Sequence, residues 1–424
     1  MSVFAISRCT SGLQGHIHVP GDKSISHRAL LFGALAEGPS LINGLSSGHD
    51  VARTWAAVHA MGAELRLAVG GWRVTGGGRS RLRQPEGPLQ AGNSGTTMRL
   101  LGGFCASFPW KVRIGGDASL STRPMDRIAH PLEAMGAVVK GKGERVLPPI
   151  TIEGGSLRGI DYTLPVPSAQ VKSAVLIAGL GAEGETVVRE SIPTRAHTEE
   201  MLAAFGVDVT SIDGVIRLRP GPIEPFTLDV PGDPSQAAFW VVAAAITPGS
   251  DLTIHRVYIG PARAAFLGVL TRMGALLDLE RHDDMTADIR VRHSSLEATE
   301  VHGAEVAGLI DEIPALAVAA AVATGTTVFR DASELRVKET DRIATVASEL
   351  AKLGVEVETF DDGLAVTGGK PLVGAPTTSH GDHRVAMAMA VAGLVASGTT
   401  RVEGWEAVDT SYPDFDEELG LCAS

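Results

Sequence analysis

The sequence predicts an α/β protein of two lobes, each built from three copies of a unit about 70 residues long. Two series of recurring residues, in phase with each other, carry this prediction. One series marks the ends of amphipathic helices, and the other marks the starts of small, Ala-rich helices that are apolar nearly all round and therefore buried. The chain has 424 residues, 44% of them apolar and 20% charged, which is ample for two globular domains.

The first series consists of a large apolar residue followed by glycine. The pairs recur every 66 to 80 residues, at Met61–Gly62, Met135–Gly136, Phe205–Gly206, Met273–Gly274, Leu353–Gly354 and Leu419–Gly420. Glycine is a common helix stop, because it adopts the left-handed conformation without strain. A strand-like, alternating segment follows each of the first five pairs, so these helices are expected to lead into strands.

The second series marks six buried helices, each followed by a Gly turn and a strand rich in Val, Ile, Leu or Thr. They are expected to start near Ser24, Ser94, Ser168, Ser235, Asp311 and Asp382. The expected change of lobe falls near Asp229–Asp233, where a strand ends in Pro-Gly. The segment before Pro20 is expected to be a lone strand, which these patterns leave free to join either lobe.

Composition excludes several classes of function. The net charge of −12 argues against a nucleic-acid-binding or acidic-lipid-binding surface. Three scattered cysteines exclude a disulfide scaffold and suit a reducing cytosol. The histidines lack further ligands to complete a metal set, so no metal is expected. The start of the chain does not resemble a signal peptide, and the apolar run at 385–396 is too short to span a bilayer.

The starts of the buried helices are unusually polar. The first carries Lys23, Ser24 and Arg28, and the N–H groups and dipole of a helix N-terminus favour anions. An ordinary capped helix with solvated cations explains one such start equally well. Similar clusters recur at 93–99, 168–173, 380–384, 121–127, 193–197 and 336–342. Equivalent ends of repeated units share one face of a lobe, so two facing lobes are expected to gather these cations into a cleft for small, multiply anionic ligands.

Two carboxylates are candidates for acid–base chemistry. Asp311 precedes the fifth buried helix, and Glu339 lies between Lys338 and Arg342. A carboxylate held among cations stays ionised and can accept a proton from a hydroxyl group. The alternatives are a helix N-cap for Asp311 and a surface ion pair for Glu339.

Taken in chain order, these segments resemble the EPSP synthase family over nearly the whole chain. The most specific are Lys338–Arg342 (Lys-Glu-Thr-Asp-Arg) and Asp382–Arg384 (Asp-His-Arg). The others that carry the resemblance are Gly21–Ser24 with Arg28, Gly92–Thr96 with Arg99, Arg123–Met125, Ser168–Ala174 and Asp229–Asp233. The Ser-Ala-Gln order at 168–170 resembles the second, often glyphosate-tolerant, class of the family.

The resemblance implies a fold that agrees with the repeat pattern. Each lobe would contain three βαβαββ units, in the inside-out α/β barrel arrangement of enolpyruvyl transferases, with the active site between the lobes. The first strand would join the C-terminal half. The implied lobes are therefore residues 20–229 and residues 1–19 plus 230–424.

The resemblance also implies which residues hold the two substrates. Those for shikimate 3-phosphate are Lys23, Ser24, Arg28, Ser168, Ala169, Gln170, Arg195, Asp311 and Lys338. Those for phosphoenolpyruvate are Lys23, Gly95, Arg123, Gln170, Arg342 and Arg384. Ala169 stands where many members have a second Ser, so one hydroxyl contact is missing, and Arg195 is expected to compensate.

The implied reaction adds the 5-hydroxyl of shikimate 3-phosphate to phosphoenolpyruvate while the methylene carbon is protonated, and the tetrahedral intermediate then expels phosphate. Asp311 would take the hydroxyl proton, and Glu339 with Lys23 would deliver or recover the methylene proton. No metal or organic cofactor is expected. The resemblance further implies a cytoplasmic monomer, without nucleic-acid or membrane partners, and glyphosate as an inhibitor. Leu100 and Thr410 differ from the first class and leave glyphosate tolerance open.

Two alternatives remain. The sister enolpyruvyl transferase that acts on UDP-N-acetylglucosamine usually has a Cys in the loop after Gly115–Gly116, where this chain has Asp117. A few of its members carry Asp there, so the Lys-Glu-Thr-Asp-Arg and Ser-Ala-Gln segments decide against it. A non-catalytic anion-binding paralogue would be expected to lose Asp311 or Glu339, and both are present. Calorimetric titration with shikimate 3-phosphate and with UDP-N-acetylglucosamine would separate the three.

Overall fold

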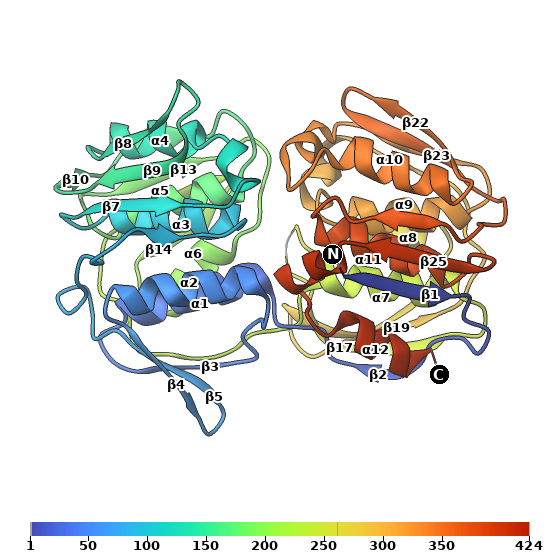
Figure 1. The fold of residues 1–424 in the computed structure, drawn as a ribbon. Helices are drawn as coiled ribbons and strands as arrows, with labels where there is room; N and C mark the ends of the chain where they lie inside the picture. The colour runs from blue at the N-terminus through green and yellow to red at the C-terminus, as the bar shows by residue number, and fades with distance from the viewer. Residues whose placement is uncertain (1, 261, 424) are drawn as a thin grey trace. The chain divides into compact units, whose positions relative to one another are not determined.

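The computed structural model describes residues 2–260 and 262–423. The chain divides into two compact units. Residues 23–230 form one, called here the continuous unit, and residues 1–22 with 231–424 form the other, called the discontinuous unit. Figure 1 shows that both units are built from helices packed against small sheets.

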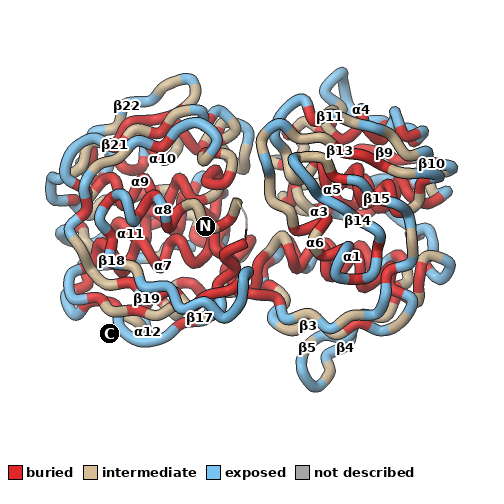
Figure 2. Tube along the Cα trace, turned by 180° about the vertical axis from the view of Figure 1, so that it is seen from behind, coloured by how far each residue is buried: buried red, intermediate tan, exposed pale blue. Residues whose placement is uncertain are grey.

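Each unit is built around three buried helices, as the Ala-rich segments predict. In Figure 2 these inner helices carry the colour of buried residues, whereas many loops and strand edges are exposed. The buried helices are α1 (Lys23–Leu35), α3 (Gly95–Ala106), α5 (Ala169–Gly179), α7 (Pro234–Ile246), α9 (Ile313–Val322) and α11 (His383–Gly393). Those that alternate with them along the chain are α2 (His49–Ala60), α4 (Asp126–Ala134), α6 (His197–Ala204), α8 (Ala265–Arg272), α10 (Arg342–Lys352) and α12 (Phe415–Cys422).

The four-stranded sheets of the described chain share one pairing pattern: a parallel pair at one edge, then two antiparallel pairs. In the continuous unit the sheets are β16 (Thr227–Asp229)-β3 (Ser40–Asn43)-β5 (Gly71–Thr75)-β4 (Glu64–Ala68), β6 (Leu89–Gln90)-β7 (Lys111–Gly115)-β9 (Leu147–Glu153)-β8 (Val138–Lys142) and β11 (Asp161–Thr163)-β13 (Thr186–Arg189)-β15 (Val215–Leu218)-β14 (Val209–Ile212). A short parallel pair is formed by β10 (Leu157–Arg158) and β12 (Ala182–Glu183).

The discontinuous unit repeats this pattern and adds a three-stranded sheet. Its sheets are β2 (Gln14–Ile17)-β17 (Asp251–Tyr258)-β19 (Thr286–Arg292)-β18 (Leu276–Arg281), β20 (Glu300–Val301)-β21 (Thr326–Phe329)-β23 (Gly363–Thr367)-β22 (Glu356–Phe360) and β1 (Val3–Ser7)-β25 (Thr399–Glu403)-β24 (Pro376–Thr378). The segment before Pro20 thus forms two strands, and the expected lone strand is wrong. Both strands pair within the discontinuous unit, β1 with β25 and β2 with β17.

The predicted helix ends are confirmed for five of the six repeats. Gly62, Gly136, Gly206, Gly274 and Gly354 all have φ between 87° and 109°, in the region that favours glycine. The sixth prediction is wrong, because Leu419 and Gly420 lie inside α12. No hairpin follows that helix, and the antiparallel partner of β25 is β1 instead. Gly420 therefore lies within a helix and does not lead into a strand.

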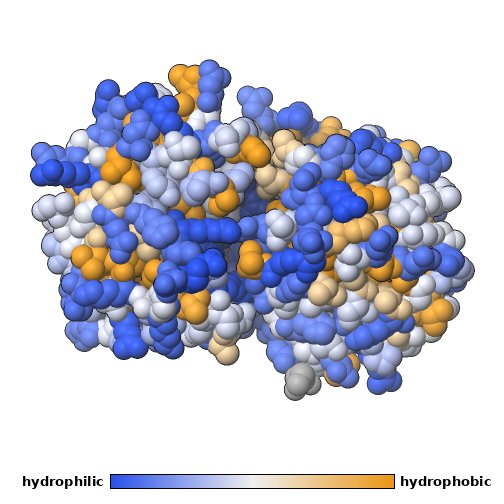
Figure 3. Space-filling model, turned by 90° about the horizontal axis from the view of Figure 1, so that it is seen from above, coloured by the Kyte–Doolittle hydropathy of each residue, from blue (hydrophilic) through white to orange (hydrophobic). Residues whose placement is uncertain are grey.

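The surface is largely polar, as Figure 3 shows for one face, where hydrophilic residues surround small hydrophobic spots. Among the helices of the described residues, none combines the length and the apolar character needed to cross a membrane.

Candidate functional site

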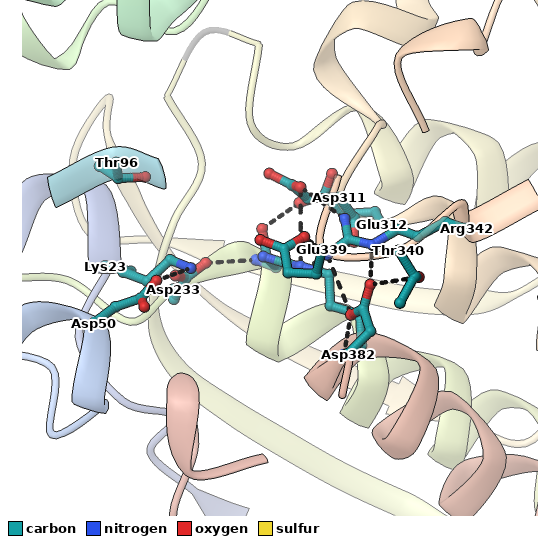
Figure 4. A network of polar contacts seen from close by, with 12 residues as sticks. Lys23, Asp50, Thr96, Asp233, Asp311, Glu312, Glu339, Thr340, Arg342 and Asp382 are labelled. Carbon is teal, nitrogen blue, oxygen red and sulfur yellow. Dashed lines mark hydrogen bonds and ion pairs between the residues drawn. The ribbon is translucent and has the colours of Figure 1, made fainter. Parts of the chain in front are cut away.

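The first polar helix start fixes the ammonium group of Lys23. Lys23 begins α1, and its Nζ lies 3.0 Å from Oδ2 of Asp50, a residue of the first turn of α2. Both side chains are mostly buried, at 15% and 7% exposure. Figure 4 shows this pair. Asp50 was not singled out from the sequence, because nothing local marks it as a partner of a residue 27 positions earlier.

The starts of α3 and α5 are joined by Gln170. Ser94 caps α3 and Ser168 caps α5, each accepting a bond from a backbone N–H of the first turn. Oε1 of Gln170 accepts from Nη1 of Arg99 at 2.6 Å, and Nε2 of Gln170 donates to Oγ1 of Thr96 at 2.9 Å. Arg99 was quoted in a motif but was not predicted as a site residue, and its side chain bonds the predicted residue Gln170.

Gly95 lies against two guanidinium groups. A Cβ atom at this position would lie 2.7 Å from Nη1 of Arg99 and 3.6 Å from Nη1 of Arg123. Arg123 follows the short helix η1 (Leu120–Thr122), is 7% exposed, and donates from Nη2 to Oγ of Ser119 at 3.1 Å. The start of α3 therefore presents its first turn beside cationic side chains, the arrangement that favours an anion.

Arg28 ties three helices of the continuous unit together. It is 2% exposed, and it donates from Nε to Thr198 at 2.7 Å, from Nη2 to Ser173 at 2.6 Å and from Nη1 to the carbonyl oxygen of Ser24 at 2.7 Å. These three acceptors are neutral. Ala169, the first residue of α5, has no hydroxyl, and the partly exposed Arg195 lies in the loop before α6.

Asp311 is not the N-cap of α9, the structural alternative raised by its position. The cap is Glu312, which makes no side-chain capping bond. The side chain of Asp311 is 18% exposed, and its Oδ1 accepts from Nη1 of Arg342 at 3.2 Å. Its carbonyl oxygen accepts from Nη1 of Arg384 at 2.9 Å, and Nε of Arg384 lies 3.9 Å from Oδ1. Asp311 is thus held between two arginines.

Arg342 is the centre of the polar network in Figure 4. Only 1% of its side chain is exposed, yet it contacts three carboxylates: Asp382 at 2.8 Å, Glu339 at 2.5 Å and Asp311 at 3.2 Å. Burial works against its charge, but these carboxylates outweigh burial and raise the pKa of Arg342 above its ordinary value. Glu339 therefore does form an ion pair, and it keeps 18% of its side chain exposed.

Two further residues complete this region. Asp382 is fully buried, accepts the N–H of Arg384 as the cap of α11, and binds Arg342 through both oxygens. Lys338 precedes Glu339, and loss of hydration lowers the pKa of its ammonium group, although Asp311 and Glu334 oppose the shift. The discontinuous unit thus brings four of the predicted residues into one network, Asp311, Glu339, Arg342 and Arg384.

A second buried cluster underlies this region and was not anticipated. Arg263 is 1% exposed and donates from Nη2 to Asp22 and Asp233, each at 2.8 Å, while its Nη1 lies 3.4 Å from Glu312. Asp22 immediately precedes Lys23, and Glu312 immediately follows Asp311. Arg263 therefore contacts the side chains of the residues next to Lys23 and Asp311.

Within residues 2–260 and 262–423, no group of three or more His, Cys, Asp or Glu side chains is arranged to hold a metal ion. The described contacts instead consist of cations beside carboxylates, hydroxyls and helix N-termini. Such an arrangement can bind phosphate and carboxylate groups and can accept a proton from a hydroxyl.

Comparison with known proteins gives one consistent result. A family model described as EPSP synthase (3-phosphoshikimate 1-carboxyvinyltransferase) matches residues 8–419. A 3-phosphoshikimate 1-carboxyvinyltransferase of Bacillus cereus is 46% identical over 419 residues, which cover 98% of both chains. One of Desulforamulus reducens is 48% identical over 413 residues, which cover 96% of both. A solved EPSP synthase structure from Acinetobacter baumannii superposes with a TM-score of 0.88 at 42% identity, covering 99% of this chain and 98% of that one.

Proposed function

The chain belongs to the EPSP synthase family, and we propose that the polar side chains described above act on the family's two substrates. Its activity is the transfer of the enolpyruvyl group of phosphoenolpyruvate to shikimate 3-phosphate, with release of phosphate, in the shikimate pathway. Both substrates carry a phosphate and a carboxylate group, which suits side chains rich in charged hydrogen-bond donors.

We propose Asp311 as the base that accepts the proton of the 5-hydroxyl of shikimate 3-phosphate. The observation that carries this proposal is that Asp311 lies between Arg342 and Arg384 while the capping position is taken by Glu312. Two cations beside a carboxylate favour its ionised form, which is the form that accepts a proton. As the hydroxyl oxygen bonds to phosphoenolpyruvate, its proton passes to Asp311.

Glu339 and Lys23 are proposed to handle the proton on the methylene carbon, which is added in the first step and removed when phosphate leaves. Glu339 is partly exposed and bonded to Arg342, and Lys23 is held at the start of α1 by Asp50. The arginines Arg123, Arg342 and Arg384, with the backbone at Gly95, are proposed to bind phosphoenolpyruvate through charge-assisted hydrogen bonds. Fixed donors of this kind stabilise the charge that develops in the transition state without reorganising during the reaction.

The remaining residues are proposed to bind shikimate 3-phosphate. Ser168, Ala169 and Gln170 form the start of α5, where the N–H groups and dipole of a helix N-terminus favour a phosphate. Lys23, Ser24, Arg28, Arg195 and Lys338 would supply donors, while Gln170 and Lys23 would also reach phosphoenolpyruvate. Because Arg28 already bonds Thr198 and Ser173, we propose that it binds substrate as part of that network.

Several finer assignments are also proposals. The second class is proposed for the chain, supported by its Ser-Ala-Gln order, and glyphosate is proposed to inhibit by competing with phosphoenolpyruvate. The lobes are proposed as residues 20–229 and residues 1–19 plus 230–424. A monomeric, cytoplasmic enzyme is proposed from the resemblance and the scattered cysteines.

A phosphate-release assay tests the activity and the assignments together. Phosphate should appear only when both shikimate 3-phosphate and phosphoenolpyruvate are present, and glyphosate should slow its release. UDP-N-acetylglucosamine in place of shikimate 3-phosphate should give no release. If phosphate were released from phosphoenolpyruvate with the nucleotide sugar but not with shikimate 3-phosphate, the chain would be assigned to the sister transferase instead.

A further inference from the structure

Lys172 is a fully buried cation inside α5, one turn after the proposed phosphate-binding residues. Its side chain is 0% exposed, and its Nζ contacts Oε1 of Glu199 at 2.7 Å and Oε1 of Glu190 at 3.0 Å. The same nitrogen lies 3.4 Å from the carbonyl oxygen of Thr194. We propose that Lys172 is a positioning residue that fixes the backbone at Arg195, so that this side chain reaches the phosphate of shikimate 3-phosphate. The inference rests on the proposed function of Arg195.

Thr194, the neighbour of Arg195, is held at three atoms. Its carbonyl oxygen lies beside Nζ of Lys172, while its N–H and Oγ1 donate to Oε2 of Glu190 at 3.2 Å and 2.7 Å. Glu190 itself is fixed by its ion pair with Lys172 and by a backbone bond from its N–H to Gly214. The loop between β13 and α6 is therefore bound to α5 immediately before Arg195.

A second set of contacts fixes the other end of the same loop. Glu199, in the first turn of α6, binds Lys172 directly. Thr198, next to it, donates to Ser173 at 2.8 Å and accepts from Arg28, so two consecutive residues of α5 contact two consecutive residues of α6. The loop that carries Arg195 is thus anchored on both sides by Lys172 and Ser173.

The cost of this arrangement indicates a role beyond packing. A buried ion pair is often no more stabilising than apolar side chains of similar volume, because its charges lose their hydration. Here one ammonium serves two carboxylates, and Oε2 of Glu199 is buried without a hydrogen-bond partner among the described residues. The cluster holds the backbone at 194–196 in a single defined position. A displacement of this backbone by about 1 Å would weaken the contact between a charged side chain and its ligand.

The first test compares Lys172→Met with the parent enzyme. If Lys172 positions Arg195, the KM for shikimate 3-phosphate should rise by about 10-fold or more, because a misplaced contact group weakens binding steeply, while the KM for phosphoenolpyruvate stays within about 2-fold. Lys111→Met is the matched control, since this lysine of the same unit is exposed and pairs with Glu153 at the surface. The control should leave both KM values unchanged.

The second test shows whether Lys172 acts through Arg195. Arg195→Ala alone should raise the KM for shikimate 3-phosphate, and adding Lys172→Met to it should change that KM by less than about 2-fold, because residues that act as one unit are not additive. Full additivity of the two effects would overturn the proposal, as would an unchanged KM in Lys172→Met.

A milder variant keeps the proposal testable if Lys172→Met does not fold. Thr194→Val removes only the hydroxyl bond to Glu190 and should raise the KM for shikimate 3-phosphate by about 3-fold, with the melting temperature nearly unchanged. An unchanged KM in this variant would overturn the inference. Failure of the inference about Lys172 is distinguishable from failure of the proposed function. In the latter case the parent enzyme itself would not use shikimate 3-phosphate with phosphoenolpyruvate.

Discussion

Two buried arginines, Arg28 of the continuous unit and Arg342 of the discontinuous unit, differ in their described contacts. In the continuous unit, Arg28 donates to two hydroxyl groups and a backbone carbonyl, all neutral acceptors. In the discontinuous unit, Arg342 contacts three carboxylates, one of them the fully buried Asp382. The two side chains are equally buried, at 2% and 1% exposure, so the difference lies in their partners and not in their access to solvent.

The contacts described for Arg28 hold its guanidinium through neutral groups, and the residue is proposed to bind shikimate 3-phosphate. A guanidinium held by carboxylates orients them, and in Arg342 it is also proposed to bind phosphoenolpyruvate. Most residues proposed for shikimate 3-phosphate lie in the continuous unit, whereas the two proposed acid–base carboxylates, Asp311 and Glu339, belong to the discontinuous unit.

The largest effect on stability is expected from Arg342→Met. Removing this arginine leaves Asp382 buried without its main cation, which costs about 3–5 kcal/mol of unfolding free energy. Arg28→Met removes bonds to neutral groups, and Thr198 and Ser173 can still bond each other, so its cost should be about 1–3 kcal/mol. Urea denaturation of both variants measures the difference. Equal losses would show that the nature of the partners does not matter.

The next largest effect concerns phosphoenolpyruvate. Arg123→Ala and Arg384→Ala should each weaken its use by about 1.5–3 kcal/mol, since each removes a charged donor. Arg384→Ala should be the more severe of the two, because it also removes a partner of Asp311. Steady-state kinetics with varied phosphoenolpyruvate provide the measurement. Unaltered kinetics in both variants would contradict the assignment.

A pH dependence is expected from Lys338. Loss of hydration lowers the pKa of this ammonium, so the charge needed for shikimate 3-phosphate is lost on raising the pH through a value below the ordinary one of about 10.4. The alkaline fall of kcat/KM for shikimate 3-phosphate should therefore move to higher pH in Lys338→Arg, because arginine stays charged. An identical pH profile in parent and variant would remove Lys338 from the set of substrate contacts.

The smallest effect is expected from Gly95→Ala. The added Cβ would crowd Nη1 of Arg99, the end of a flexible side chain that can move. We expect it to weaken inhibition by glyphosate more than it raises the KM for phosphoenolpyruvate, since the inhibitor is longer. Inhibition assays on parent and variant make the comparison, and equal inhibition would show that Gly95 serves only the backbone.

The sequence predicted what depends on local patterns. Glycines such as Gly62 and Gly354 end helices because their left-handed backbone is a local requirement, and Ser94 and Ser168 are caps for the same reason. It did not predict Arg263, whose partner Asp22 is 241 residues away, because such a pairing leaves no periodic signal.

Two strand pairings between distant segments were not predicted for the same reason. β16, at the end of the continuous unit, pairs with β3 near its beginning, and β2 leaves the first repeat to pair with β17. These pairings join segments far apart in the chain, whereas the repeat pattern reports only neighbours. Position alone also could not separate an N-cap from a catalytic role for Asp311, and the structure places Glu312 at the cap.

The most direct measurement is the turnover of Asp311→Asn. Asparagine keeps the shape and can still hydrogen-bond the 5-hydroxyl, but it cannot accept the proton. The variant should melt near the parent temperature and bind shikimate 3-phosphate with near-parent affinity, while turnover falls by about 10²- to 10⁴-fold, as for a lost general base. A stable variant with full turnover would contradict the assignment and leave Glu339 as the remaining carboxylate candidate.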